Sequence, residues 1–347
     1  MDVLEKKPIS IWFFAFGYFA CYVPFSFLTK AISKGFFADT QKTISGFSLL
    51  PVSVLSSFIC MVIFLYFSGL WRYASKWSLG NMSLPRPTIW TFLSGLLTSL
   101  IIVTTTLSYT FNGVSIVFVM LLMRGGVLCI APLVDAISNR KVSWFSIVGL
   151  ILSLLALVVA FSEKGGYVIT LLCALNVLVY IFSYFARLRF MSKIAKSSKQ
   201  GDNFKFFVEE QLVATPILII LLFLIAIFSS GDLALKLHYG FFNIWGHESF
   251  YLVILTGVFS QGVGIFGGLI LLNKSENTFC VPVNRCSSIM AGLVASLSLA
   301  IVFNQPLPSV YKIIAAAIII VAILFLTIPT LFKPRELKAA AQIKHPA

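Results

Sequence analysis

Charge is the scarcest feature of this 347-residue chain, because only 11% of its residues are Asp, Glu, Lys or Arg. Soluble proteins contain about 25% charged residues. Hydrophobic residues make up 59% of the chain, and the mean hydropathy is +0.97. This balance excludes an ordinary soluble domain. It predicts an all-α integral membrane protein, since a helix satisfies its own backbone hydrogen bonds in lipid.

The chain also lacks the residue groups on which common enzyme chemistry depends. It has no Gly-x-x-x-x-Gly-Lys loop, so an ATP-driven pump would need another subunit. The three histidines lie outside the apolar stretches, and no pair of carboxylates lies in the middle of one. The six cysteines fall in apolar stretches without a Cys-x-x-Cys pair, which predicts buried thiols. We therefore expect no catalytic residues, no metal site and no cofactor.

Hydropathy predicts ten membrane-spanning helices. They are expected at residues 9–29, 46–69, 89–110, 113–137, 143–161, 167–189, 206–229, 249–272, 278–303 and 310–332. The Lys/Ser-rich stretch 190–205 lies near the midpoint and is expected to be a cytoplasmic linker. The stretch 230–248 is expected to lie on the opposite membrane face as a short interfacial segment, because it mixes polar residues with Leu, Phe and Trp.

The basic residues are distributed unequally between the two sides of such a bundle. The loops on the side of the N-terminus hold 18 of the 26 Lys and Arg residues, and the opposite loops hold six. By the positive-inside rule, both termini are predicted to be cytoplasmic, in the inner membrane if the cell is bacterial. The same bias explains the formal net charge of +14 as a topology signal, so we expect no nucleic-acid partner.

The two halves of the chain can be aligned as a repeat. Residues 127–161 and 292–326 each hold the end of a span, a short polar turn, one apolar residue and another apolar helix, at an offset of 165 residues. Five helices is an odd number, so the halves must have opposite orientations in the membrane. We predict a first five-helix repeat over 1–165 and a second over 166–347, within a single membrane domain.

The third to fifth predicted helices carry a recognisable series of features. These are a short hairpin (LSYTFNGVS, 107–115), the run MLLMRGG (120–126), a proline in the fourth span, a tight polar turn and a glycine-bearing fifth helix. The series resembles the drug/metabolite transporter superfamily, in its nucleotide-sugar-transporter-like and chloroquine-resistance-transporter-like branch. The resemblance implies ten helices in two inverted five-helix repeats, with both termini cytoplasmic. Many members have Gly-Glu at the turns, where this chain has Asn139 and Asn304.

Arg124 is a permanent cation near the middle of the predicted fourth span. It lies about 16 Å into a hydrocarbon core about 30 Å thick, counting from Gly113. Arginine at such a depth costs roughly 2.5–3.5 kcal/mol on insertion scales. It is either a structural arginine bonded to carbonyls or an acid, or a substrate-contacting cation. We favour the second, and Gly125 and Gly126 would let a helix or ligand approach closely.

Arg285 is the second intramembrane cation, about seven residues from the cytoplasmic end of the predicted ninth span. It either snorkels toward the lipid headgroups or faces Arg124 across a central cavity, because the repeat makes the fourth and ninth helices counterparts. Two arginines would favour phosphate, sulfate or carboxylate, which arginine binds with two parallel hydrogen bonds.

Few acidic residues lie within the predicted spans to neutralise these arginines. Asp135 is expected to form a local ion pair with Arg140. Glu209 and Glu210 open the seventh helix, where each carboxylate either caps the helix or couples transport to protons or charge. The remaining predicted substrate-binding residues, each of which could equally bond to a neighbouring helix, are Tyr22, Tyr109, Asn176, Tyr180, Gln261 and Asn284.

The sequence as a whole predicts a secondary transporter that moves a small organic, anionic or zwitterionic metabolite by alternating access. We expect it not to be an enzyme. Its expected partners are a small-molecule substrate and membrane lipid, and it is expected to be a monomer or homodimer. Two alternatives remain: a membrane-embedded enzyme or lipid-modifying scaffold that uses His238 and His247, and a channel component.

Overall fold

The computed structural model describes residues 10–37, 44–79, 82–107, 116–162, 170–197, 199, 201–305 and 307–343. This part of the chain forms the helices α1 (Ile11–Ser33), α2 (Gly46–Ser68), α3 (Ile89–Leu107), α4 (Ile116–Ile137), α5 (Trp144–Phe161), α6 (Leu171–Phe190), α7 (Asp202–Phe228), α8 (Asp232–Phe242), α9 (Phe250–Leu271), α10 (Asn277–Phe303) and α11 (Val310–Ile343). Three short helical turns, η1 (Leu70–Tyr73), η2 (Met191–Ala195) and η3 (Ile244–Gly246), and an antiparallel hairpin of β1 (Lys76–Leu79) and β2 (Met82–Pro85) complete it.

Each of the ten ranges predicted from hydropathy contains an α-helix. Within the described residues, eight helices are long and apolar enough to cross a membrane: α1, α2, α5, α6, α7, α9, α10 and α11. A shorter apolar stretch covers 89–105 in α3. The chain is therefore a multi-pass, mainly α-helical membrane protein, as its composition predicts.

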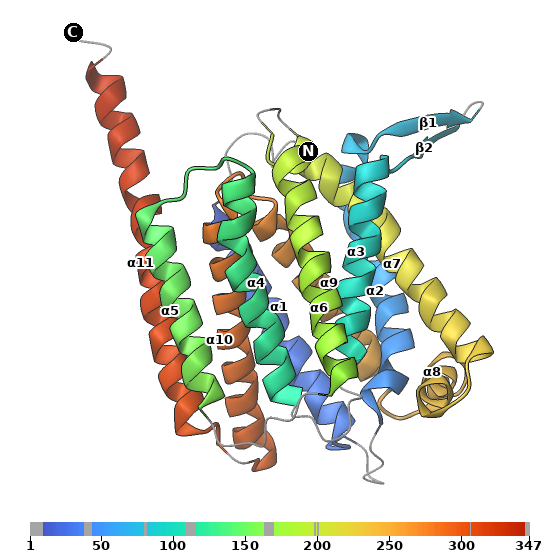
Figure 1. Ribbon diagram of the computed structural model, residues 1–347. Helices are drawn as coiled ribbons and strands as arrows, with labels where there is room; N and C mark the ends of the chain where they lie inside the picture. The colour runs from blue at the N-terminus through green and yellow to red at the C-terminus, as the bar shows by residue number, and fades with distance from the viewer. Residues whose placement is uncertain are drawn as a thin grey trace.

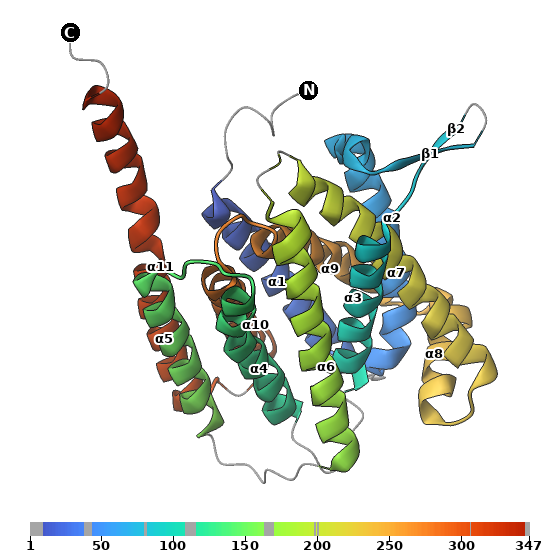
Figure 2. The same ribbon diagram turned by 45° about the horizontal axis from the view of Figure 1, so that its top comes forward.

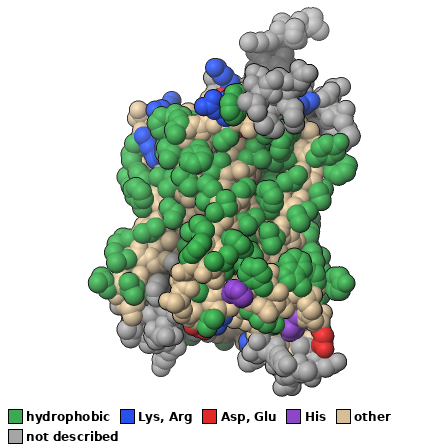
Figure 3. All heavy atoms as spheres, turned by 90° about the vertical axis from the view of Figure 1, so that its right-hand side faces the viewer, with side chains coloured by type: hydrophobic (Ala, Val, Ile, Leu, Met, Phe, Trp, Pro, Cys, Tyr) green, Lys and Arg blue, Asp and Glu red, His purple; other side chains and the backbone are tan. Residues whose placement is uncertain are grey.

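The long helices run side by side in one bundle (Figure 1). The start of α1 and the last turns of α11 lie at the same end as η2 and the β1–β2 hairpin; we call this the linker end. Figure 3 shows one face of the bundle covered by hydrophobic side chains, with Lys and Arg gathered toward the linker end. Such a band is the surface expected of a protein that contacts lipid acyl chains.

The helices pack in a regular set of pairs. Helix α1 packs against α9 and α10, while α6 packs against α3 and α4. In the same way α2 packs on α9 and α7 on α3, and α5 and α11 lie together at one edge of the bundle (Figure 2). Small residues allow these contacts, because packing and hydrogen bonds, rather than hydrophobicity, hold helices together in lipid.

Gly257 shows how closely α9 approaches α2. A Cβ at this position would lie 2.4 Å from the carbonyl oxygen of Ser53, a backbone atom that cannot rotate away. We expect Gly257→Ala to destabilise the protein by about 1–3 kcal/mol, the usual cost of overpacking. The measurement is the thermal unfolding midpoint in detergent. Gly246→Ala is the matched control, since nothing lies within 4 Å of its Cβ position, and equal losses in the two variants would contradict the prediction.

Several elements differ from the sequence-based expectation. The stretch 190–205 is mostly helical: α6 continues through η2 to Ala195, and α7 begins at Asp202. The apolar side chains of Met191, Ile194 and Ala195 recur at helical spacing, and Met191 and Ala195 are fully buried. The β1–β2 hairpin was not predicted, although Gly80-Asn81 between two short alternating segments is a hairpin signal. The stretch 230–248, expected to be a short interfacial segment, forms a short helix, α8, at the opposite end from the linker (Figure 1).

The cysteines only partly match the expectation of buried thiols. Cys173, Cys280 and Cys286 are buried, Cys21 and Cys60 are half-buried, and Cys129 is exposed. Cys129 lies on α4 in an otherwise apolar stretch, and its thiol is nevertheless exposed.

Candidate functional site

A cavity of about 120 Å³ lies inside the bundle between α1, α3, α4, α6 and α10. Arg124 and Arg285 both line it, so the structure brings together the two arginines that the sequence places on different helices. The other lining residues are Tyr18, Tyr22, Ile101, Thr105, Met123, Tyr180, Tyr184 and Ser288. We call this the central cavity.

Arg285 is the most deeply buried cation of the central cavity, with 7% of its surface exposed. Its guanidinium carbon lies 4.9 Å from the centre of the Tyr184 ring, a cation–π contact. The Nε of Arg285 is buried and has no hydrogen-bond partner. A buried donor without an acceptor costs about 1–3 kcal/mol, and more when it is charged. An acceptor that reached this donor would remove that cost.

Arg124 lies across the cavity on α4 and is half-buried. One of its terminal nitrogens donates to the hydroxyl of Tyr22 on α1, at 3.3 Å. Among the described residues, neither Arg124 nor Arg285 forms an ion pair with Asp or Glu. The cavity therefore holds two positive charges and several hydroxyl groups, which suits an anionic group with several acceptor oxygens.

Tyrosines form most of the remaining polar lining. Tyr180 and Tyr184 are one helical turn apart on α6, with ring centres 4.9 Å apart, and Tyr18 and Tyr22 are paired in the same way on α1 at 5.5 Å. Tyr184 was not among the predicted residues. Its spacing of four from Tyr180, and of eight from Asn176, is the signal that places it on the same helix face.

Other predicted residues join helices outside the cavity lining. Asn176 donates its side-chain amide to the carbonyl of Thr104 on α3, at 2.9 Å. Gln261 accepts from the hydroxyl of Ser57 on α2, at 2.7 Å. Both contacts match the alternative of a helix–helix bond. Asn284 is buried on α10 beside Gly267 of α9, and Tyr109 lies outside the described residues.

Glu209 and Glu210 are fully buried and lie away from the cavity lining. Because α7 begins at Asp202, seven and eight residues before them, the prediction that they open and cap this helix is wrong. Glu209 accepts from the backbone N–H groups of Ser75 and Thr88, at 2.9 and 3.1 Å, and so ties the strand segment and the start of α3 to α7.

Glu210 forms a two-point ion pair with Arg187 of α6, at 2.8 Å to both Nε and a terminal nitrogen. The hydroxyls of Ser94 and Thr98 also donate to it. The sequence indicated Arg187 only as one of the basic residues at the ends of the spans. In the structure it is buried, with only 6% of its surface exposed.

A polar network joins several segments at the linker end of the bundle. Asp135 at the end of α4 accepts from the backbone N–H groups of Asn277 and Thr278, at 2.9 and 2.6 Å, and so caps α10. The predicted ion pair between Asp135 and Arg140 is wrong. Arg140 instead donates to four backbone carbonyls, those of Ser192, Lys196, Lys274 and Ser275. Carbonyls at the ends of these segments lack partners in their own helices, which is why they accept from an arginine.

Lys196 completes this network from the end of η2. Its ammonium donates to the carbonyl of Ser275 at 2.8 Å and to the side-chain oxygen of Asn277 at 3.0 Å. Burial lowers the pKa of the Lys196 ammonium, and the positive charge of Arg140 lowers it further. The network connects the α4–α5 turn, η2 and the α9–α10 turn, which belong to both halves of the chain.

Comparison with known proteins shows a shared fold and no family. No protein-family model matches the sequence, and no curated protein matches it. A solved structure described as "Crystal structure of protein" superposes with a TM-score of 0.56 at 12% identity. The match covers 94% of this chain and 98% of that chain, so nearly the whole helical arrangement is one that another protein also adopts.

Proposed function

We propose that the protein is a secondary transporter that moves a small organic, anionic or zwitterionic metabolite across the membrane by alternating access. The observation that carries this proposal is the unpartnered Nε of buried Arg285 in a cavity that also holds Arg124. An anionic group of the substrate would accept from Arg285 and neutralise both arginines. Without substrate the two cations repel each other, which favours reopening of the empty carrier.

Access to the cavity would alternate between the two ends of the bundle. The network of Asp135, Arg140 and Lys196 joins the turns at the linker end in the described arrangement, and we infer that it keeps this end closed. Transport requires those bonds to break while the opposite end closes, as two halves rock about the central site. Exchange of one anion for another or coupling to protons would supply the energy.

We further propose that α3 and α4 also cross the membrane, so that ten spans form two inverted repeats. The repeats would be α1–α5, and α6, α7, α9, α10 and α11. In these repeats α1 corresponds to α6, α3 to α9 and α4 to α10. The packing supports this, because α1 packs against α9 and α10 while its counterpart α6 packs against the counterparts α3 and α4. Asn139 and Asn304, 165 residues apart, also both follow a helix with positive φ, at 50° and 49°. Asparagine tolerates this left-handed backbone at a helix end.

This organisation agrees with the resemblance to the drug/metabolite transporter superfamily, and we propose membership of it. We also propose that the linker end is cytoplasmic, which puts both termini there. The gathering of Lys and Arg toward that end supports this orientation (Figure 3).

The enzyme alternative gains no support from the two histidines on which it depends. The His238 ring packs on the Phe242 ring at 4.7 Å, and Nδ1 of His247 accepts from the backbone N–H of Ser249 at 3.1 Å. These local contacts account for both side chains, and neither residue lines the central cavity.

The proposal is tested by thermal stabilisation followed by flux. A ligand at 100 times its Kd should stabilise the purified protein by about 2.7 kcal/mol, so a panel of small organic anions identifies a substrate. Arg124→Ala should then reduce uptake of that anion into proteoliposomes at least ten-fold. Arg86→Gln, at an exposed position of the linker end, is the control. Unchanged uptake by Arg124→Ala would refute the central site, and unsaturable flux with single-channel currents would identify a channel.

A further inference from the structure

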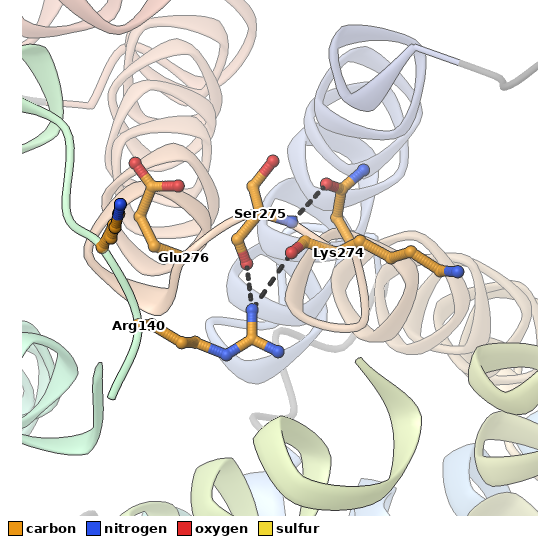
Figure 4. Close-up of a pocket in the computed structure, with 6 residues that line it drawn as sticks. Arg140, Lys274, Ser275 and Glu276 are labelled. Atoms are coloured by element: carbon orange, nitrogen blue, oxygen red, sulfur yellow. Dashed lines mark hydrogen bonds between the residues drawn. The ribbon is translucent and has the colours of Figure 1, made fainter. Parts of the chain in front are cut away.

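A second pocket, of about 380 Å³, opens at the linker end between the α4–α5 turn and the α9–α10 turn (Figure 4). Its lining residues are Arg140, Lys141, Asn273, Lys274, Ser275 and Glu276, and it shares none of them with the central cavity. We call it the turn pocket. Three of its six residues are cationic and one is acidic, so its formal charge is positive.

The acidic residue is already occupied with other contacts. An Oε1 oxygen of Glu276 accepts from the hydroxyl of Ser146 at 2.7 Å and from the backbone N–H of Ser143 at 3.4 Å. Both donors lie at the start of α5, where the helix dipole offsets negative charge. Figure 4 shows the carboxylate of Glu276 turned away from the guanidinium of Arg140. The positive charge of the pocket therefore remains available to an anion.

The pocket presents several hydrogen-bond donors. The terminal nitrogens of Arg140 are held by backbone carbonyls, among them those of Lys274 and Ser275 at 3.1 and 3.5 Å, which fixes the guanidinium in place (Figure 4). Within the described residues, the ammonium of Lys141 and the hydroxyl of Ser275 make no hydrogen bond. Lys274 makes one exposed contact, at 3.4 Å, to the carbonyl of Lys199, which is readily exchanged for an anion.

Two exposed tryptophans indicate that the pocket lies at the depth of the lipid headgroups. Trp144, the first residue of α5, is 66% exposed and only three residues beyond Lys141. Trp90, at the start of α3, is also exposed at this end of the bundle. Exposed tryptophans of membrane proteins gather at the boundary between acyl chains and headgroups. A basic pocket between helix ends at this depth is a known type of site for acidic lipid headgroups.

We propose that the turn pocket binds a phosphate group and that its occupant is the headgroup of an anionic membrane lipid. The phosphate oxygens contact Lys141 from one turn and Lys274 from the other, beside the fixed guanidinium of Arg140. A ligand that contacts both turns binds best when they are together, so it favours the arrangement in which the linker end is closed. The binding itself does not depend on the proposed transport activity.

The test measures the thermal unfolding midpoint of the full chain in detergent while phosphatidylglycerol or phosphatidylcholine is added. We expect phosphatidylglycerol to raise the midpoint more than phosphatidylcholine. Lys141→Gln combined with Lys274→Gln should weaken the apparent affinity for phosphatidylglycerol about 25-fold, since each lysine near an anionic lipid contributes about 1 kcal/mol, or about five-fold. The midpoint in phosphatidylcholine should stay unchanged, which shows that the double variant folds.

Two controls test whether the stabilisation arises at the turn pocket and from a lipid. Lys236→Gln removes a lysine of α8 that pairs with Asp232 at the opposite end, and it should leave the phosphatidylglycerol effect intact. Inorganic phosphate at millimolar concentration should raise the midpoint less than the lipid does. An equal effect of inorganic phosphate would overturn the assignment to lipid. An unchanged phosphatidylglycerol affinity in the double lysine variant would overturn the site.

Discussion

Arg285→Met is expected to weaken anion binding about 30-fold or more while the empty protein keeps its stability or gains some. Truncating one partner of a buried charged contact costs about 2–5 kcal/mol, and each 1.36 kcal/mol is ten-fold in affinity. The loss appears as a higher Kd in thermal stabilisation by the anion and as slower uptake into proteoliposomes.

The stability of the empty protein distinguishes a binding residue from a structural one. Arg285 has no acidic partner among the described residues and its Nε has no acceptor, so the empty protein bears the penalty of a buried charge. The Tyr184 contact offsets part of that penalty, at about 2 kcal/mol for a desolvated cation–π pair. Burying a lone charge costs several kcal/mol per ion, so an apolar side chain of similar length should be tolerated.

Arg187→Met serves as the comparison for this result. Arg187 is buried to a similar degree but is paired at two points with Glu210, so its loss leaves an unpaired carboxylate and should destabilise the protein. If Arg285→Met were the less stable variant and bound the anion normally, Arg285 would be a structural residue and the central site would be wrong.

Most of the helices were predictable because eight of those described are apolar stretches long enough to span the membrane. The two arginines were predictable for the opposite reason: a charge inside such a stretch is costly and therefore conspicuous. Tyr184 carried no comparable signal, since a tyrosine in a membrane helix serves equally well in packing. Whether Arg124 and Arg285 share one cavity depends on the relative rotation of α4 and α10, which no local pattern specifies.

Hydrogen-bond partners were the least predictable feature. Asn176 and Gln261 bond to Thr104 and Ser57, which lie 72 and 204 residues away along the chain. Asp135 was assigned to its sequence neighbour Arg140, but it caps a helix that begins 142 residues later. A sequence shows that a buried polar group needs a partner, whereas only the packed helices show which one it has.

The Arg187–Glu210 pair is expected to give the largest loss of stability. Glu210→Met should lower the free energy of unfolding by about 3–5 kcal/mol, because it leaves Arg187 buried and uncompensated. Replacing both residues by methionine removes both charges, and an apolar pair of similar volume is often neutral or stabilising. The double variant should therefore recover most of the loss, measured as the thermal unfolding midpoint of all four combinations in detergent. Additive losses would contradict a coupled pair.

The same double variant decides between the two roles open to Glu210. Arg187 lies three residues beyond Tyr184 on α6, and Tyr184 contacts Arg285, so the pair is placed to hold this side of the cavity in position. A residue with that role alone affects uptake only through stability, because it binds no proton during the cycle. We therefore expect uptake by the double variant to keep the pH dependence of the unchanged protein, with at most a modest change in KM. Restored stability together with a lost pH dependence would instead identify Glu210 as the coupling carboxylate.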